Sequence, residues 1–202
     1  LFMQWGEGLP AQHMDMDLSC RLAKANDKEE ICYYGNLIAT GCKHSGDIRA
    51  IPEKVGTAEY IDIDLPALAA ADVRYATFSC NAYSVGSITP NMLVGWMGSE
   101  HKMTISTVTG VAYDPSCVQQ QVRITRPLTK GLVFGVLDVL VREIVWLEVP
   151  VHGQVAMQYD MQGVQALLAK LNARLNVGAL LRLKAEAQNL QVLDTQDGAD
   201  EI

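Results

Sequence analysis

Two short segments with strictly alternating apolar and polar residues restrict the fold of this chain more than any other feature. Residues 14–20 read Met-Asp-Met-Asp-Leu-Ser-Cys, and residues 60–65 read Tyr-Ile-Asp-Ile-Asp-Leu. An alternation with a period of two is typical of a β-strand that buries one face. We therefore expect two half-buried strands, each with an Asp-x-Asp pair on its outer face, and we expect Pro66 to end the second.

Several further segments up to residue 150 are rich in β-branched and aromatic residues. These are residues 31–34, 75–83, 91–97, 112–113, 119–125, 132–140 and 144–149. A long loop with several glycines is expected over residues 40–57. Such a series of short strands separated by turns predicts a mainly β domain over residues 1–150, an antiparallel β-sandwich of about seven or eight strands.

After Pro150 the pattern changes to a period of three to four, which is typical of a helix face. A first segment contains Val164, Leu167, Leu168 and Leu171, and a second, residues 179–190, contains Leu180, Leu183, Ala187 and Leu190. We expect an αα-hairpin over residues 151–193, followed by an acidic, flexible tail over residues 194–202. The apolar face of this hairpin can dock either on its own β-domain or on a partner protein.

The charge balance limits the classes of partner. The 202 residues carry a net charge of −7, which argues against nonspecific nucleic-acid binding. Only 19% of the residues are charged, so we expect part of the surface to be buried against protein partners or in self-association. No apolar stretch reaches the ~18 residues of a membrane span, which leaves only peripheral association with a membrane. Five cysteines at irregular spacing fit a reducing, cytoplasmic compartment.

The arrangements that catalysis usually requires are not evident in the sequence. The histidines are scattered, no serine lies in a G-x-S-x-G elbow, and no glycine-rich loop carries a GK[ST] motif. Cys42 and His44 are soft metal ligands that His13 or Cys32 can join, but their spacing fits no zinc signature. We therefore predict a binding protein and not an enzyme.

The acidic pairs have two interpretations. Residues i and i+2 of a strand share a face, with Cα atoms about 6.6 Å apart, so Asp15 with Asp17 and Asp62 with Asp64 each form a pair of neighbouring carboxylates. Calcium binds about six to eight oxygens from carboxylates and carbonyls, and the turn at residues 46–47 can supply more of them. The alternative is that the four aspartates only solvate the outer face. Spacing alone leaves both interpretations open.

Five short motifs follow one another between residues 14 and 73. They are Met-Asp-Met-Asp-Leu-Ser at 14–19, Tyr-Tyr-Gly-Asn-Leu at 33–37, His-Ser-Gly-Asp at 44–47, Glu-Tyr-Ile-Asp-Ile-Asp-Leu at 59–65 and Ala-Asp-Val at 71–73. In this order they resemble the motifs of the TerD-type tellurite-resistance and stress proteins of bacteria. The resemblance covers residues 5–97, thins out towards residue 150, and does not include the helical end.

This resemblance implies a β-sandwich without catalytic activity that binds calcium at one end. It further implies a cytoplasmic, stress-related role, often near a membrane and within multi-protein assemblies. The acidic residues that match acidic positions of the family are Asp15, Asp17, Asp47, Glu59 and Asp64, whereas Asp62 stands at a variable position. The expected metal site therefore consists of Asp15, Asp17, Gly46, Asp47, Glu59, Asp62 and Asp64.

One segment departs from the family pattern. Before the Glu-x-Ile strand the family usually has a run rich in glycine and aspartate, whereas residues 49–58 here hold one carboxylate, Glu53, and two cations, Arg49 and Lys54. Because ligand charge sets the affinity of a calcium site, this change predicts weaker binding. The alternative function is therefore a protein-interaction module or scaffold with a degenerate metal site.

Overall fold

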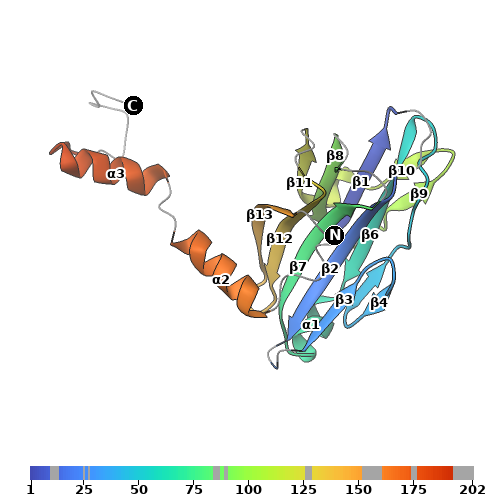
Figure 1. The fold of residues 1–202 in the computed structure, drawn as a ribbon, viewed down its shortest axis with the longest axis horizontal. Coiled ribbons are helices and arrows are strands. Elements are labelled where there is room, and N and C mark those ends of the chain that lie inside the picture. The colour runs from blue at the N-terminus through green and yellow to red at the C-terminus, as the bar shows by residue number, and fades with distance from the viewer. Residues whose placement is uncertain are drawn as a thin grey trace. The chain divides into compact units, whose positions relative to one another are not determined.

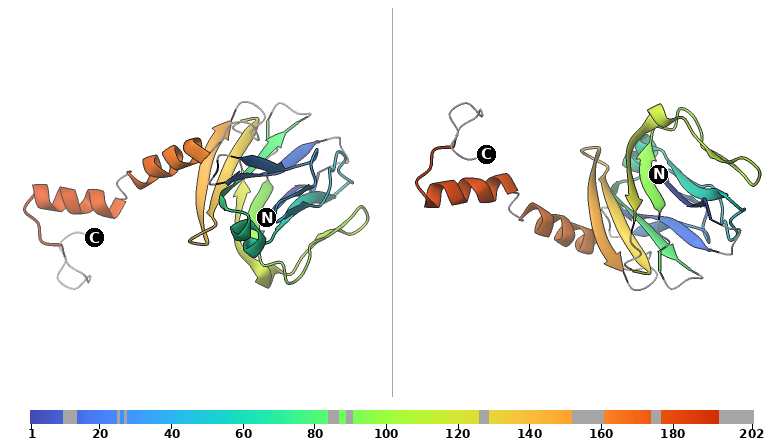
Figure 2. Two further views of the ribbon diagram at one scale, coloured as in Figure 1. Left: turned by 90° about the horizontal axis from the view of Figure 1, so that it is seen from below. Right: turned by 90° about the horizontal axis from the view of Figure 1, so that it is seen from above.

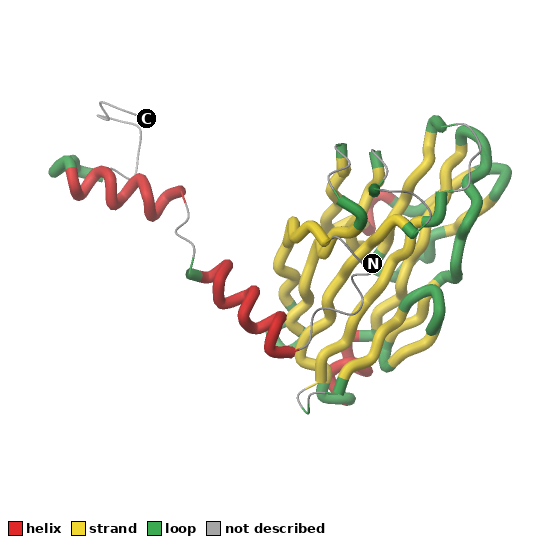
Figure 3. The backbone as a smooth tube through the Cα atoms, in the orientation of Figure 1, coloured by secondary structure: helices red, strands yellow, loops and turns green. Residues whose placement is uncertain are grey.

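The computed structural model of this chain describes residues 1–9, 14–24, 26, 28–83, 87–88, 91–125, 129–151, 161–173 and 177–192. Strands dominate up to residue 151, and helices follow (Figure 1, Figure 3). The chain divides into two compact units, Leu1–Val164 and Gln165–Ile202. This confirms the prediction of a mainly β chain with a helical end.

The first unit contains two large antiparallel sheets. The strands of one sheet are β1 (Phe2–Glu7), β4 (Ile38–Ala39), β5 (Cys42–His44), β6 (Val55–Ile63), β8 (Met92–Met97) and β11 (Val118–Ile124). They are ordered β11-β8-β1-β6-β5-β4. The strands of the other sheet are β2 (Met16–Lys24), β3 (Glu29–Cys32), β7 (Val73–Ala82), β12 (Gly131–Asp138) and β13 (Glu143–Val151). They are ordered β13-β12-β7-β2-β3.

Smaller elements join these strands. A two-stranded sheet consists of β9 (Thr104–Ser106) and β10 (Gly110–Ala112), and a 3₁₀ turn, η1 (Pro115–Cys117), leads into β11. The short helix α1 (Leu65–Ala70) connects β6 to β7. Because β8 and β11 are antiparallel partners, the loop after β8 lies close to the turn η1 that precedes β11.

The two large sheets share one apolar core. Leu18 on β2, Phe78 on β7 and Phe134 on β12 contribute to it from one sheet, and Trp5 on β1 and Val94 on β8 from the other. All five side chains are almost completely buried. The sheets lie in two layers (Figure 2), an arrangement that agrees with the predicted β-sandwich.

The outer face of β2 and β7 is buried too. Their register places three polar pairs side by side: Asp17 with Asn81, Ser19 with Ser79, and Arg21 with Thr77. None of these six side chains is more than 9% exposed. Of the two interpretations of the aspartates, the one in which they only solvate the outer face does not hold for Asp17, which is only 3% exposed.

Most predicted strands are present with shifted bounds. Segments 14–20, 75–83, 91–97, 119–125, 132–140 and 144–149 correspond to β2, β7, β8, β11, β12 and β13. The described residues contain thirteen strands, more than the expected total, because strands such as β4, β5 and β9 are too short to show a period. Alternation does not reveal β1 either, since its residues are buried on both faces.

Two predictions between residues 40 and 66 are wrong. The expected loop 40–57 contains β5 and the first residues of β6. The strand expected to continue to Leu65 ends at Ile63, because Asp64 caps α1: its Oδ1 accepts a hydrogen bond from the amide of Ala67 at 3.0 Å. Pro66 fits the first helical turn, where an amide proton would have no helical partner.

The second part of the chain contains α2 (Met161–Asn172) and α3 (Val177–Ala187), which confirms both predicted helices. β13 runs through Val151, one residue into the segment expected to be helical. The packing of the two helices as a hairpin stays a prediction, and the acidic tail 194–202 lies outside the described residues. Within the described part of the chain, none of the helices combines the length and apolar character needed to cross a bilayer.

Candidate metal centre

Three of the predicted acidic residues lie together at the start of β2. Asp15 precedes β2, Asp17 is its second residue, and Asp47 lies in the loop between β5 and β6. One carboxylate oxygen from each lies within 4.8 Å of the others. The Asp-x-Asp pair of a strand and a carboxylate from a distant turn therefore converge, as the metal-site interpretation requires.

Asp17 is the most buried member of this acidic group. Its Oδ2 accepts a hydrogen bond from Nδ2 of Asn81 at 3.0 Å, its register partner on β7. The pKa of Asp17 is raised to about 7, first by burial and then by the negative charges of Asp15 and Glu59. Near neutral pH a large fraction of this carboxyl group is therefore protonated unless a cation takes the place of the proton.

The other two carboxylates are influenced by a nearby cation. Burial raises the pKa of Asp15, the charge of Asp47 raises it further, and the charge of Arg49 counteracts the rise. The Nε and Nη2 atoms of Arg49 lie 2.8 and 2.7 Å from Oδ2 of Asp47. The Arg49 side chain is 74% exposed, so this pair is an exposed ion pair that competes with any metal for Asp47.

Glu59 fixes the geometry of the acidic group from the core side. Its side chain is fully buried, and its two oxygens accept hydrogen bonds from the amides of Leu18 at 2.9 Å and Ile48 at 3.1 Å. Burial raises its pKa, while these hydrogen bonds and His44 oppose the rise. Glu59 on β6 therefore connects one sheet to β2 of the other and holds the loop that carries Asp47.

His44, together with Glu59, binds the backbone of β2. The amide of Gly46 donates to Nδ1 at 3.0 Å, so in the neutral ring the proton is on Nε2, which lies 3.1 Å from the carbonyl oxygen of Leu18 and 3.5 Å from Oε2 of Glu59. In the register, β3 pairs with β2 only from Cys20 onward. The two side chains thus bind the backbone of Leu18 on an edge that β3 does not reach.

Each residue of the His-Ser-Gly-Asp motif has a separate role in the turn. Ser45 joins the turn to β6 twice, because its amide donates to the carbonyl of Tyr60 at 2.8 Å and its Oγ accepts from the amide of Tyr60 at 2.9 Å. Gly46 has a φ of 118°, a backbone conformation that residues with a side chain rarely adopt. This conformation turns the chain so that Asp47 follows directly at the acidic group.

Asp62 and Asp64 are not brought into the acidic group. Glu59 and Asp62 lie three residues apart on β6 and therefore on opposite faces of the strand. Asp62 is paired in register with Lys43 and lines a cavity of about 190 Å³. Asp64 caps α1. The second pair does not repeat the first because the strand ends between its two aspartates.

Sequence reasoning did not identify Asn81, and it named Arg49 and His44 without predicting their contacts around the acidic group. Asn81 binds Asp17, Arg49 binds Asp47, and His44 supports the backbone of Leu18. Only the pairing register of β2 and β7 reveals Asn81. The other two lie in or next to the resembling turn, whose motif marks their positions but not their contacts.

The acidic group is chemically suited to a hard cation. Its three side-chain donors are all carboxylate oxygens, the ligand type that calcium and magnesium prefer. A scan against models of known protein families found no match, and neither did a search of curated proteins. The TerD-type resemblance therefore rests on the five sequence motifs alone.

Proposed function

We propose that this chain is a non-enzymatic, calcium-binding stress-response domain of the TerD type, built as a β-sandwich. One observation carries the proposal: oxygens of Asp15, Asp17 and Asp47 lie within 4.8 Å of one another, and Asp17 is buried. The stress-related and cytoplasmic parts of the proposal are supported by the order of the five motifs in the sequence.

The electrostatics of the acidic group favour a bound cation. Carboxylates this close repel one another, and the repulsion grows where water is excluded. The raised pKa of Asp17, to about 7, expresses this cost, since burial and the charges of Asp15, Glu59 and Asp47 all disfavour its ionised form. A divalent cation removes the repulsion and stabilises all three carboxylates in their ionised form.

Calcium is the cation that fits best. The donors come from a strand end and a loop, an arrangement that suits the flexible coordination of calcium more than the strict octahedron of magnesium. Carbonyl and water oxygens must add to three carboxylates to reach about six to eight ligands. The ion pair between Arg49 and Asp47 has to open when the ion binds, so we propose a modest affinity.

A thermal titration tests this function. Chelator-treated protein is unfolded with and without millimolar calcium, and we expect calcium to raise Tm because it binds only the folded state. Asp47→Asn should abolish the shift. Asp62→Asn is the matched control, because it removes the same charge from an aspartate outside the acidic group, and it should retain the shift. An unchanged Tm of the wild type, or an equal shift in Asp47→Asn, would falsify the proposal.

A second candidate function, a protein-interaction module, is favoured by α3. Its large apolar side chains are exposed: Val177, Leu180, Leu181 and Leu183 are each between 49% and 71% accessible. Such a surface fits self-association or docking on a partner. Light scattering over a range of concentrations tests self-association. Self-association is supported if the measured mass rises with concentration and the Leu181→Glu variant stays at the monomer mass. A wild type that keeps the monomer mass at every concentration contradicts it.

A further inference from the structure

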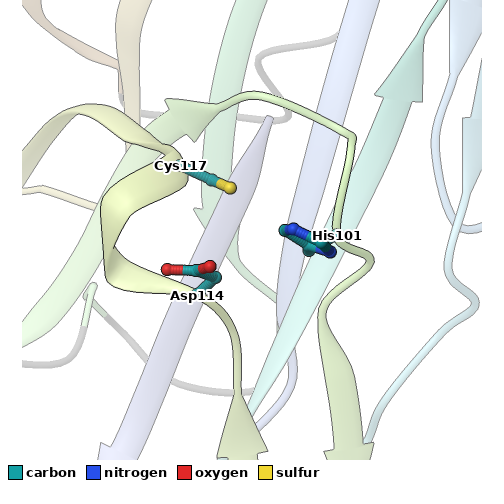
Figure 4. A group of neighbouring side chains, drawn as sticks. All are labelled: His101, Asp114 and Cys117. Atoms are coloured by element: carbon teal, nitrogen blue, oxygen red, sulfur yellow. The ribbon is translucent and has the colours of Figure 1, made fainter.

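Three further metal-ligating side chains converge on a different part of the β-unit. Suitable atoms of His101, Asp114 and Cys117 lie within 4.8 Å of one another, and Figure 4 shows the side chains around a common space. His101 lies in the loop between β8 and β9, whereas Asp114 caps the turn η1 and Cys117 is its last residue. None of the three is buried.

The turn η1 holds two of these residues in place. Asp114 caps the turn, since its Oδ1 accepts hydrogen bonds from the amide of Ser116 at 2.9 Å and from its Oγ at 2.7 Å. The amide of Cys117 donates to the carbonyl of Asp114 at 3.1 Å. The spacing of the carboxylate and the thiol is therefore fixed by local backbone structure.

The loop with His101 is tied to the same turn. The amide of Gly98 donates to the carbonyl of Cys117 at 2.9 Å, which links the beginning of the loop to the ligand turn. At the other end of the loop, Met103 is buried in a small cluster with Phe2. The ring of Tyr113, next to Asp114, packs on Phe2 with centroids 5.7 Å apart. The loop and the turn thus share one apolar anchor.

The geometry points to a second metal site, formed by His101, Asp114 and Cys117, for a borderline-soft divalent cation such as zinc. Imidazole nitrogen, thiolate sulfur and carboxylate oxygen are the ligands that zinc takes in proteins. A tetrahedral zinc ion holds its ligand atoms about 3.5 Å apart, so rotation of these accessible side chains closes the group around an ion. Three protein ligands leave the fourth position to water or a small ligand.

This second metal site differs chemically from the acidic group around Asp17. A thiol and an imidazole are poor ligands for calcium, while they bind zinc and cobalt well. The carboxylate is also oriented within this site, because its Oδ1 accepts hydrogen bonds from the amide and the Oγ of Ser116. The two sites should therefore bind different ions independently.

Cobalt absorption spectroscopy tests this proposal. The untagged full chain, kept reduced with a non-thiol reductant, is titrated with Co²⁺ in the presence of excess calcium. We expect one equivalent to give the thiolate-to-cobalt charge-transfer band and the intense visible bands of a tetrahedral site, and stoichiometric zinc should displace both. Cys117→Ser should lose the charge-transfer band, and His101→Ala should weaken binding at least about tenfold, by comparison with the smaller losses from outer-shell changes.

Two controls separate this proposal from its alternatives. Glu100→Gln removes a neighbouring charge in the same loop and should bind cobalt as the wild type does. Asp47→Asn changes only the acidic group and should leave the cobalt spectrum unchanged, so a failure of the calcium proposal is recognised separately. The inference is overturned if the charge-transfer band persists in Cys117→Ser with unchanged Tm, or if no band forms in the wild type.

Discussion

The acidic group around Asp17 and the mixed group around Cys117 are both sets of three side chains that could hold a metal ion, but they are built in opposite ways. The first is fixed from beneath by a fully buried carboxylate, Glu59, and includes a side chain that is only 3% exposed. The second is held by turns and a small apolar anchor at the surface. Charge repulsion within a buried group has to be compensated, whereas a surface group of mixed donors can remain empty at little cost.

The largest effect on stability should come from replacing Glu59, the buried carboxylate that supports the acidic group. Glu59→Ala removes the acceptor of the buried amide of Leu18 and of the partly buried amide of Ile48, and it leaves a cavity between the sheets. We expect a loss of about 3–5 kcal/mol in the free energy of unfolding, measured by urea denaturation. Glu53→Ala, at an exposed position, should cost almost nothing. A loss below about 1 kcal/mol for Glu59→Ala would show that the hydrogen bonds of Glu59 contribute little to the stability of the fold.

The next largest effect concerns calcium and pH together. At calcium about 100-fold above its Kd, the free energy of unfolding of the wild type should rise by about 2.7 kcal/mol, and Asp17→Asn should lose most of this gain.

The pKa of Asp17 rises from 3.8 to about 7 on folding, so the protonated form is favoured in the folded state. In the metal-free protein, this preference for the protonated carboxyl group of Asp17 stabilises the folded state. The stabilisation is fully present below pH 3.8 and is lost as the pH rises through about 7.

Thermal unfolding of chelator-treated protein between pH 5.5 and pH 8.5 therefore checks the role of Asp17 (about one to two units on either side of its pKa). We expect Tm of the wild type to fall towards the alkaline end, and calcium to restore it there. Asp17→Asn should flatten this part of the profile. An unchanged slope in Asp17→Asn assigns the pH dependence to another group.

A smaller effect should distinguish the second aspartate pair from the first. Asp64 accepts a hydrogen bond from the amide of Ala67 at the start of α1, so Asp64→Ala should cost about 1 kcal/mol of stability. Because Asp64 does not join the acidic group, the calcium-induced rise in Tm should remain. Loss of that rise would return Asp64 to the metal site that the sequence predicts.

The smallest effect should be a gain. Arg49 binds Asp47 as an exposed ion pair, and such pairs contribute up to about 1 kcal/mol. Arg49→Gln should therefore tighten calcium binding about two- to fivefold, measured by calorimetry at low salt, where charge effects are least screened. Lys54→Gln is the matched control for net charge, since Lys54 lies near Glu53 instead of the acidic group.

The sequence predicts the acidic group better than it predicts the mixed one, for physical reasons. Asp15 and Asp17 lie two residues apart on or beside a strand, and a period of two is visible without a structure. Asp114 and Cys117 meet through a turn, and His101 reaches them only because β8 and β11 are paired. Pairing between distant strands leaves no local pattern, so neither this group nor the contact of Asn81 with Asp17 follows from spacing.

The fold shows the same division. Strands with one buried face are recognisable by alternation, whereas β1 is buried on both faces and its sequence shows no alternation. Asp64 caps a helix, but in the sequence it continues the alternating pattern of the strand before it. After Ile63 the alternation of apolar and polar residues favours a continued strand, whereas the cap and the proline favour the start of a helix. The chain forms the helix.

The hydrogen bonds of Glu59 also have a kinetic consequence. The amide of Leu18 lies on a strand of the core, so its proton should exchange with solvent only when the two sheets separate. The amide of Ile48 binds the same carboxylate but lies in the loop with Asp47, so its proton can exchange when the loop alone opens. The difference between these two exchange rates therefore measures how often the loop with Asp47 opens while the rest of the domain stays folded. If an ion binds at Asp47 as proposed, it should reduce that difference.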